Sequence, residues 1–146
     1  MWEDSIASNL AARAAAHQQG DTGEELHAMD YLVYAYLQIG RDQEAAQVIQ
    51  QAAALQNLDM GDFKSGYAAT VMPIRYIVER HQWSNAEKVS LPPASVMPQV
   101  LATALWARGV GFARNGHPQE ARKQADALRQ IEERLRASGA AYWETQ

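Results

Sequence analysis

The sequence predicts an all-α fold, a right-handed α-solenoid of about six to seven helices arranged as antiparallel pairs. In several segments, apolar residues recur with the i, i+3, i+4, i+7 spacing of one helix face. Short glycine-centred turns, at Gly40 and Gly116, follow two of these segments and favour a reversal between antiparallel helices. The same helix–turn–helix unit also recurs along the chain, which is typical of a repeat protein. We therefore expect residues 1–146 to form a single helical repeat domain.

Residues 2–18 are expected to form the second helix of a repeat whose first helix is absent. Ile6, Leu10 and an alanine-rich face would pack on a neighbouring helix. Gly20 and Asp21 then end this helix. Residues 1–20 are therefore interpreted as a half repeat.

Residues 22–57 are expected to form a complete helical hairpin. Thr22 and Glu25 have the spacing of a capping box, and Gly40 ends the first helix. Asp42 is expected to cap the second helix. The apolar face of the first helix contains Leu26, Met29, Leu32, Val33 and Tyr36, and that of the second contains Ala45, Val48, Ile49, Ala52 and Ala53.

Residues 62–90 predict a less regular hairpin. Its first helix spans residues 63–81, and Pro73 inside it removes one backbone donor and is expected to kink the helix. A brief second helix over residues 83–88 is cut short by Leu91, Pro92 and Pro93. The apolar side of the first helix contains Tyr67, Thr70, Val71, Ile74, Ile77 and Val78.

Residues 97–138 predict the last complete hairpin. Pro98 and Pro118 stand where the first turn of each helix begins, Gly116 ends the first helix and Gly139 ends the second. Residues 140–146 are expected to begin a further helix. The inward positions are Val100, Leu101, Ala104, Leu105, Gly109 and Phe112 in the first helix and Ala121, Ala125, Leu128, Ile131 and Leu135 in the second.

The hairpin over residues 22–57 resembles a tetratricopeptide repeat (TPR). Its matching positions are Leu32, Tyr36, Gly40, Ala45, Ile49 and Ala52, whereas Met29 replaces a tryptophan and Val33 a glycine. The position of close helix contact recurs along the chain and is occupied by a small residue each time. These residues are Ser5, Ala45, Ala86 and Ala121, which lie 40, 41 and 35 positions apart. The usual period is about 34, and HEAT repeats, with about 40–47, are the alternative fold. The repeats are therefore degenerate copies of the TPR pattern.

The two ends of the sequence carry large apolar residues instead of the polar caps that solenoids need. Trp2 stands at one end, and Tyr142 and Trp143 stand at the other. The chain is similar to stretches of longer bacterial TPR proteins, so we expect it to be a fragment of such a protein. We also expect the exposed terminal helices to support a homodimer.

Composition excludes several functional classes. The formal net charge of −4 provides no basic surface for nucleic acid, and the absence of cysteine excludes disulfides and thiol catalysis. The longest uncharged run, residues 89–107, contains three prolines and does not predict a membrane span. Glu3 and Asp4 stand where a signal peptide would be basic, so a soluble, cytoplasmic protein is the default expectation.

The sequence contains little that predicts chemistry. Glu24 and His27 have the spacing of half a di-iron site, but no second copy of that motif exists, so we expect no metal. The nucleophile elbow, the phosphate loop and G-x-G-x-x-G are absent, so we expect no cofactor and no enzyme activity. Gly109 and Gly111 lie in a helical pattern, and close helix packing explains them better than nucleotide binding does.

The TPR resemblance implies a concave face formed by the first helix of each repeat, where a peptide or partner protein binds. The candidate binding residues on that face are His27, Asp30, Tyr34, Gln38, Arg75, Glu79, Trp106 and Arg114. A protein–protein interaction scaffold is therefore the main hypothesis, with a solvated face as the competing interpretation. The alternatives are a small-ligand or enzyme-associated domain, with a pocket around Tyr34, Arg75 and Trp106, and a structural spacer.

Overall fold

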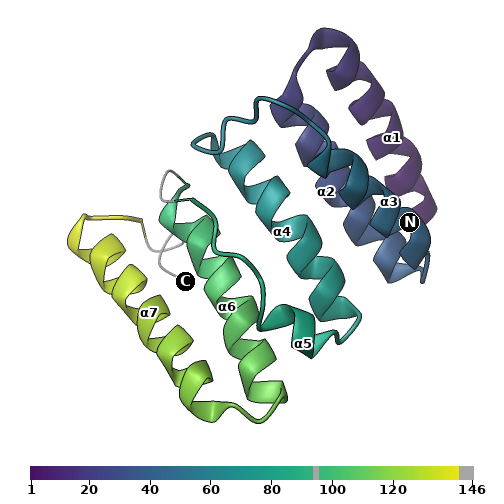
Figure 1. Ribbon diagram of the computed structural model, residues 1–146. Coiled ribbons are helices and arrows are strands. Elements are labelled where there is room, and N and C mark those ends of the chain that lie inside the picture. The colour runs from purple at the N-terminus through teal and green to yellow at the C-terminus, as the bar shows by residue number, and fades with distance from the viewer. Residues whose placement is uncertain (94–95, 142–146) are drawn as a thin grey trace.

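The computed structural model describes residues 1–93 and 96–141, and it is all-α over these residues (Figure 1). None of the described helices is long and apolar enough to cross a membrane. The described residues form seven helices: α1 (Trp2–Gln19), α2 (Thr22–Gln38), α3 (Asp42–Ala53), α4 (Phe63–Glu79), α5 (Trp83–Ala86), α6 (Pro98–Arg114) and α7 (Pro118–Ala137).

Helices α1 and α7 lie at opposite ends of the molecule, with α2, α4 and α6 in that order between them (Figure 1). Helix α2 packs against α4, and α4 packs against α6, so these three helices form a central row. Helices α1 and α3 pack on α2, while α5 and α7 pack on α6. Most contacts therefore join helices that are close in sequence.

The main hydrophobic core is centred on α2. Leu26, Met29, Leu32 and Val33 are completely buried, and Tyr36 is nearly so, which confirms the apolar face predicted for this helix. Ala45 and Val48 of α3 and Met72 of α4 complete the same cluster. A smaller cluster joins α4 to α6 and contains Ile74, Ala104, Ala107, Val78 and Val89.

The predicted helix ends are correct where glycine terminates a helix. Gly20, Gly40, Gly116 and Gly139 all have positive φ, between 71° and 78°, a conformation that glycine adopts without steric cost. Helix α4 ends two residues earlier than predicted. His81 has a φ of 53° and so cannot continue the helix.

Two predicted helix caps are wrong. Asp21, and not Thr22, caps α2, and its carboxylate accepts a hydrogen bond of 3.0 Å from the Glu24 backbone N–H. The Glu25 carboxylate does not reach back to the cap, because it pairs with Arg13 and with His17, at 3.0 Å from the His17 ring. Asp42 is the first residue of α3 and not its cap, because Arg41 occupies the cap position.

The segment that contains α4 and α5 is irregular, as the sequence predicts. Helix α4 continues through Pro73, whereas α5 is a single turn. Val71 and Ile74 are buried as expected, and the small or flexible residues Ala68 and Met72 are buried in addition. The expected further helix over residues 140–146 lies mostly outside the described residues.

Close backbone packing brings α5 against α6. A Cβ atom added at Gly111 would lie 2.4 Å from the Glu87 backbone nitrogen and 2.8 Å from the Ala86 carbonyl carbon. Gly109, one half-turn away, faces α7, where its nearest neighbour would be the Cβ of Gln124 at 3.4 Å. Close helix packing is therefore confirmed as the role of Gly111.

Candidate functional site

An exposed stripe runs along α2. His27, Tyr31, Tyr34 and Gln38 are spaced by four, three and four residues, so their side chains share one side of the helix. All four are exposed, although Tyr31 and Tyr34 are aromatic. Tyr31 was not among the predicted site residues, and its spacing of four from His27 is the signal that would have identified it.

Equivalent positions on α4 and α6 extend this stripe across the central row. Arg75 is equivalent to Tyr34 when the hairpins are aligned on Ala45 and Ala86, and the two side chains are in contact. On α6, Trp106 lies one turn before the equivalent position and is 48% exposed. We call the surface formed by His27, Tyr31, Tyr34, Gln38, Arg75, Glu79, Trp106 and Arg114 the row face.

A cluster around Arg75 joins α4 to α2. The Arg75 guanidinium donates to the Asp30 carboxylate and, at 3.2 Å, to the Asp30 backbone carbonyl. It also lies 5.2 Å from the centre of the Tyr34 ring. Trp2 of α1 then contacts Tyr34 edge to face, with ring centres 5.4 Å apart. These contacts fix the orientation of Tyr34.

Asp30 is the one predicted site residue that is buried, with 7% of its surface exposed. Burial raises the pKa of the Asp30 carboxyl group, because the charged form loses its hydration, and the Arg75 cation acts in the opposite direction. Asp30 and Arg75 therefore neutralise each other. Arg75 is not a free cation for a charged ligand.

The remaining charges near the row face are also largely engaged. Lys64 of α4 forms an ion pair with Glu24 of α2, and this interaction raises the pKa of the Lys64 amine. Arg114 at the end of α6 lies over Trp83, 5.5 Å from the ring centre. The row face therefore combines exposed aromatic rings with two arginines, Arg75 and Arg114, that already have partners.

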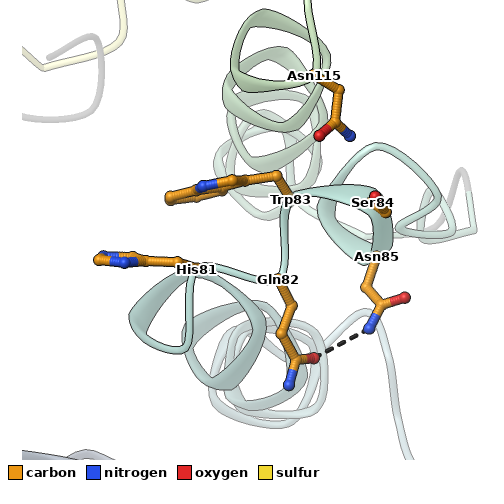
Figure 2. Close-up of a pocket in the computed structure, with 6 residues that line it drawn as sticks. All are labelled: His81, Gln82, Trp83, Ser84, Asn85 and Asn115. Carbon is orange, nitrogen blue, oxygen red and sulfur yellow. Dashed lines mark hydrogen bonds between the residues drawn. The ribbon is translucent and has the colours of Figure 1, made fainter.

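A shallow polar cavity of about 240 Å³ lies beside α5 (Figure 2). Figure 2 shows the rings of His81 and Trp83 stacked and pointing to the same side, while Asn85 donates to Gln82 at 3.0 Å. Trp83 is thus engaged by both His81 and Arg114. The residues that line this cavity are His81, Gln82, Trp83, Ser84, Asn85 and Asn115.

Glu87, which directly follows α5, contacts the turn between α6 and α7 next to this cavity. Its carboxylate accepts from the Asn115 amide at 3.1 Å and lies 3.1 Å from the His117 ring nitrogen. The Asn115 hydrogen bond, with a smaller contribution from His117, lowers the pKa of Glu87. These contacts connect α5 to the turn between α6 and α7, which is a structural role.

A second cavity, of about 360 Å³, lies against α4. Neither of these two cavities is lined by Tyr34, Arg75 or Trp106, the residues around which the sequence predicted a small-ligand pocket. Helices α2 and α4 are instead joined at this place by the contacts of Arg75 with Asp30 and Tyr34.

The described residues contain no group of three or more acidic or histidine side chains placed to hold a metal ion. Glu24 pairs with Lys64, and the His27 ring contacts Tyr31 edge to face at 5.1 Å.

No protein-family model matches the sequence, and comparisons with curated proteins and with solved structures give no match either.

Proposed function

We propose that this chain is a protein–protein interaction scaffold built from TPR-like repeats. In this proposal the hairpins are antiparallel pairs of a right-handed α-solenoid, and α2, α4 and α6 are their first helices. The central row of these helices supports the assignment. The row face is then the concave surface, and it binds a peptide or a partner domain.

The observation that carries the proposal is the exposure of aromatic rings on this face. Tyr31 and Trp106 are each 48% exposed, and Tyr34 is 37% exposed. Aromatic side chains supply much of the binding energy in protein interfaces, because they bury a large area at a small cost in conformational entropy. Three exposed rings on one face therefore favour an interface over a purely solvated surface.

The charges of the row face indicate the kind of partner. Asp30 and Arg75 neutralise each other, and Lys64 is paired with Glu24. A strongly acidic or basic peptide would have to compete with these pairs. We therefore expect a weakly charged, apolar or aromatic segment, with Gln38, Glu79 and Arg114 forming a polar rim at one end of the face.

The residues of the site have different roles in this proposal. Tyr34 and Trp106 contact the partner directly. Arg75 is a positioning residue, because it touches one face-forming ring and ties α4 to α2. Asp30 is buried and acts only by holding Arg75.

Trp106→Ala is expected to abolish most of the affinity for peptides selected on this chain. Peptides are selected from a random display library on the wild-type chain, and their dissociation constants are then measured by fluorescence anisotropy. We expect a loss of at least about tenfold, as for the aromatic hot spots of other interfaces. The matched control is Leu10→Ala on α1, because Leu10 is not packed on a neighbouring helix as the sequence predicted but is similarly exposed, at 45%.

The control is expected to change the affinity by less than about twofold, since surface substitutions away from an interface have small effects. Equal effects of Trp106→Ala and Leu10→Ala would contradict the proposal. So would the failure of the library to yield any peptide that competes with the others for one site.

A further inference from the structure

The cavity of about 360 Å³ lies on the side of α4 that faces away from Arg75. Ala69, Pro73 and Ile77 are four residues apart, so they form one strip of α4 along the cavity. Because α5 is only one turn long, residues 89–93 and not a full second helix form the opposite wall. The lining residues are Met60, Ala69, Thr70, Pro73, Ile74, Ile77, Val89, Ser90, Leu91, Pro92 and Pro93.

Pro73 removes the usual helical donor to one backbone carbonyl of this strip. In an α-helix the backbone N–H of residue 73 would donate to the carbonyl of residue 69, but proline has no N–H. Both Ala69 and Pro73 line the cavity. No side-chain hydrogen bond of the described residues reaches the Ala69 carbonyl. A carbonyl that lacks its usual helical N–H donor favours a ligand that brings one.

The rest of the lining is almost entirely apolar. Its side-chain polar groups are the hydroxyls of Thr70 and Ser90. An apolar pocket with a few polar groups that fix orientation is the usual form of a small-molecule site, and about 300–1,000 Å³ is the usual size. A cavity of about 150 Å³ already holds benzene, so this one has room for a fused two-ring molecule.

We infer that this cavity binds a small, uncharged, mostly apolar molecule with a single N–H or O–H donor, and that the Ala69 carbonyl accepts that donor. The site is separate from the row face, because its strip lies on the opposite side of α4. Binding here does not depend on the proposed function, and the two can fail independently.

Indole and 1-methylindole are the probes, because they differ in having and lacking the N–H donor. Each is titrated into the full 146-residue chain by isothermal titration calorimetry, for the wild type and for Pro73→Ala. The substitution returns an N–H to the Ala69 carbonyl and removes a helix-breaking residue, so the variant is expected to fold. We expect the preference for indole over 1-methylindole to fall by about threefold to tenfold in Pro73→Ala, because the loss of one hydrogen bond changes an affinity by about that factor.

A filled-cavity variant tests the location independently. Ala69→Leu is expected to weaken both probes by at least about tenfold, because its larger side chain enters the space they occupy. Ala137→Leu, at an exposed position on α7, is the control and should leave both affinities unchanged. Circular dichroism and thermal unfolding establish that each variant retains its helices.

Three results would overturn the inference. The first is no binding of either probe to the wild type at millimolar concentration. The second is an unchanged preference for indole over 1-methylindole in Pro73→Ala, which includes the case in which both probes lose affinity equally. That result would show that the preference does not come from the Ala69 carbonyl. The third is full binding to Ala69→Leu.

Discussion

Arg75→Met is expected to lower the free energy of unfolding by about 2–4 kcal/mol at neutral pH, because removing one member of a buried ion pair leaves the other uncompensated. Asp30 has only 7% of its surface exposed, and the Arg75 side chain is 21% exposed. Methionine keeps much of the apolar stem of arginine but provides no donor. Urea unfolding followed by circular dichroism measures the effect.

The penalty of Arg75→Met should depend on pH. Burial already raises the folded-state pKa of Asp30 above its ordinary value of 3.8, and Arg75 is the main group that opposes this rise. A raised folded-state pKa gives stability that is fully present below the unfolded-state pKa and is lost as the pH rises through the folded-state value. Without Arg75 the folded-state pKa rises further, so the penalty should be smaller near pH 4 than near pH 7.

The matched control is the double variant that carries Asp30→Asn together with Arg75→Met. Asparagine is nearly isosteric with aspartate and carries no charge, so the double variant should recover part of the lost stability at pH 7. It should also lack the pH-dependent part of the penalty. A double variant as unstable as Arg75→Met, or a penalty equal at both pH values, would show that Asp30 is not the uncompensated charge.

Gly111→Ala is expected to destabilise the chain by about 1–3 kcal/mol, the usual cost of overpacking a close helix contact. The added methyl group would lie 2.4 Å from the Glu87 backbone nitrogen, and a backbone cannot move aside as a side chain can. Thermal unfolding gives the loss of stability. Hydrogen exchange is expected to increase first in α5, because that single turn has to move away from α6.

Gly109→Ala separates this clash from the helix propensity of alanine. Its nearest neighbour, the Gln124 Cβ atom at 3.4 Å, leaves room for a methyl group. Alanine is favoured over glycine in a helix interior by about 1 kcal/mol, so this variant should be at least as stable as the wild type. Equal behaviour of the two variants would contradict the close approach at Gly111.

Most helices of the fold were predictable from the sequence, because apolar periodicity and helix-ending glycines are local signals. The apolar spacing from Leu26 to Tyr36 identified the buried face of α2, and Gly40 and Gly116 marked helix ends. The caps were harder to predict. Asp21 and Thr22 both have a suitable side chain, and the choice between them depends on where the Glu25 carboxylate finds its partners in α1.

The site was only partly predictable, because pairing across helices is a tertiary property. Helical spacing placed Asp30 and Tyr34 on one stripe, but it did not show that Asp30 is buried and held by Arg75. Tyr31 was missed because the predicted stripe took Asp30, three residues after His27, instead of Tyr31, four residues after it. The contact of Trp2 with Tyr34 joins residues 32 positions apart and leaves no local signal.

The most direct test of the proposed function is an amide chemical-shift map of the chain bound to a peptide selected on it. If the row face is the binding surface, the largest shifts should cluster on α2, α4 and α6, around Tyr31, Tyr34, Arg75, Trp106 and Arg114. Pairing of the existing charges predicts that added salt changes the affinity little. Shifts concentrated on α7 or on the outer side of α1, with the row face unchanged, would contradict the proposal.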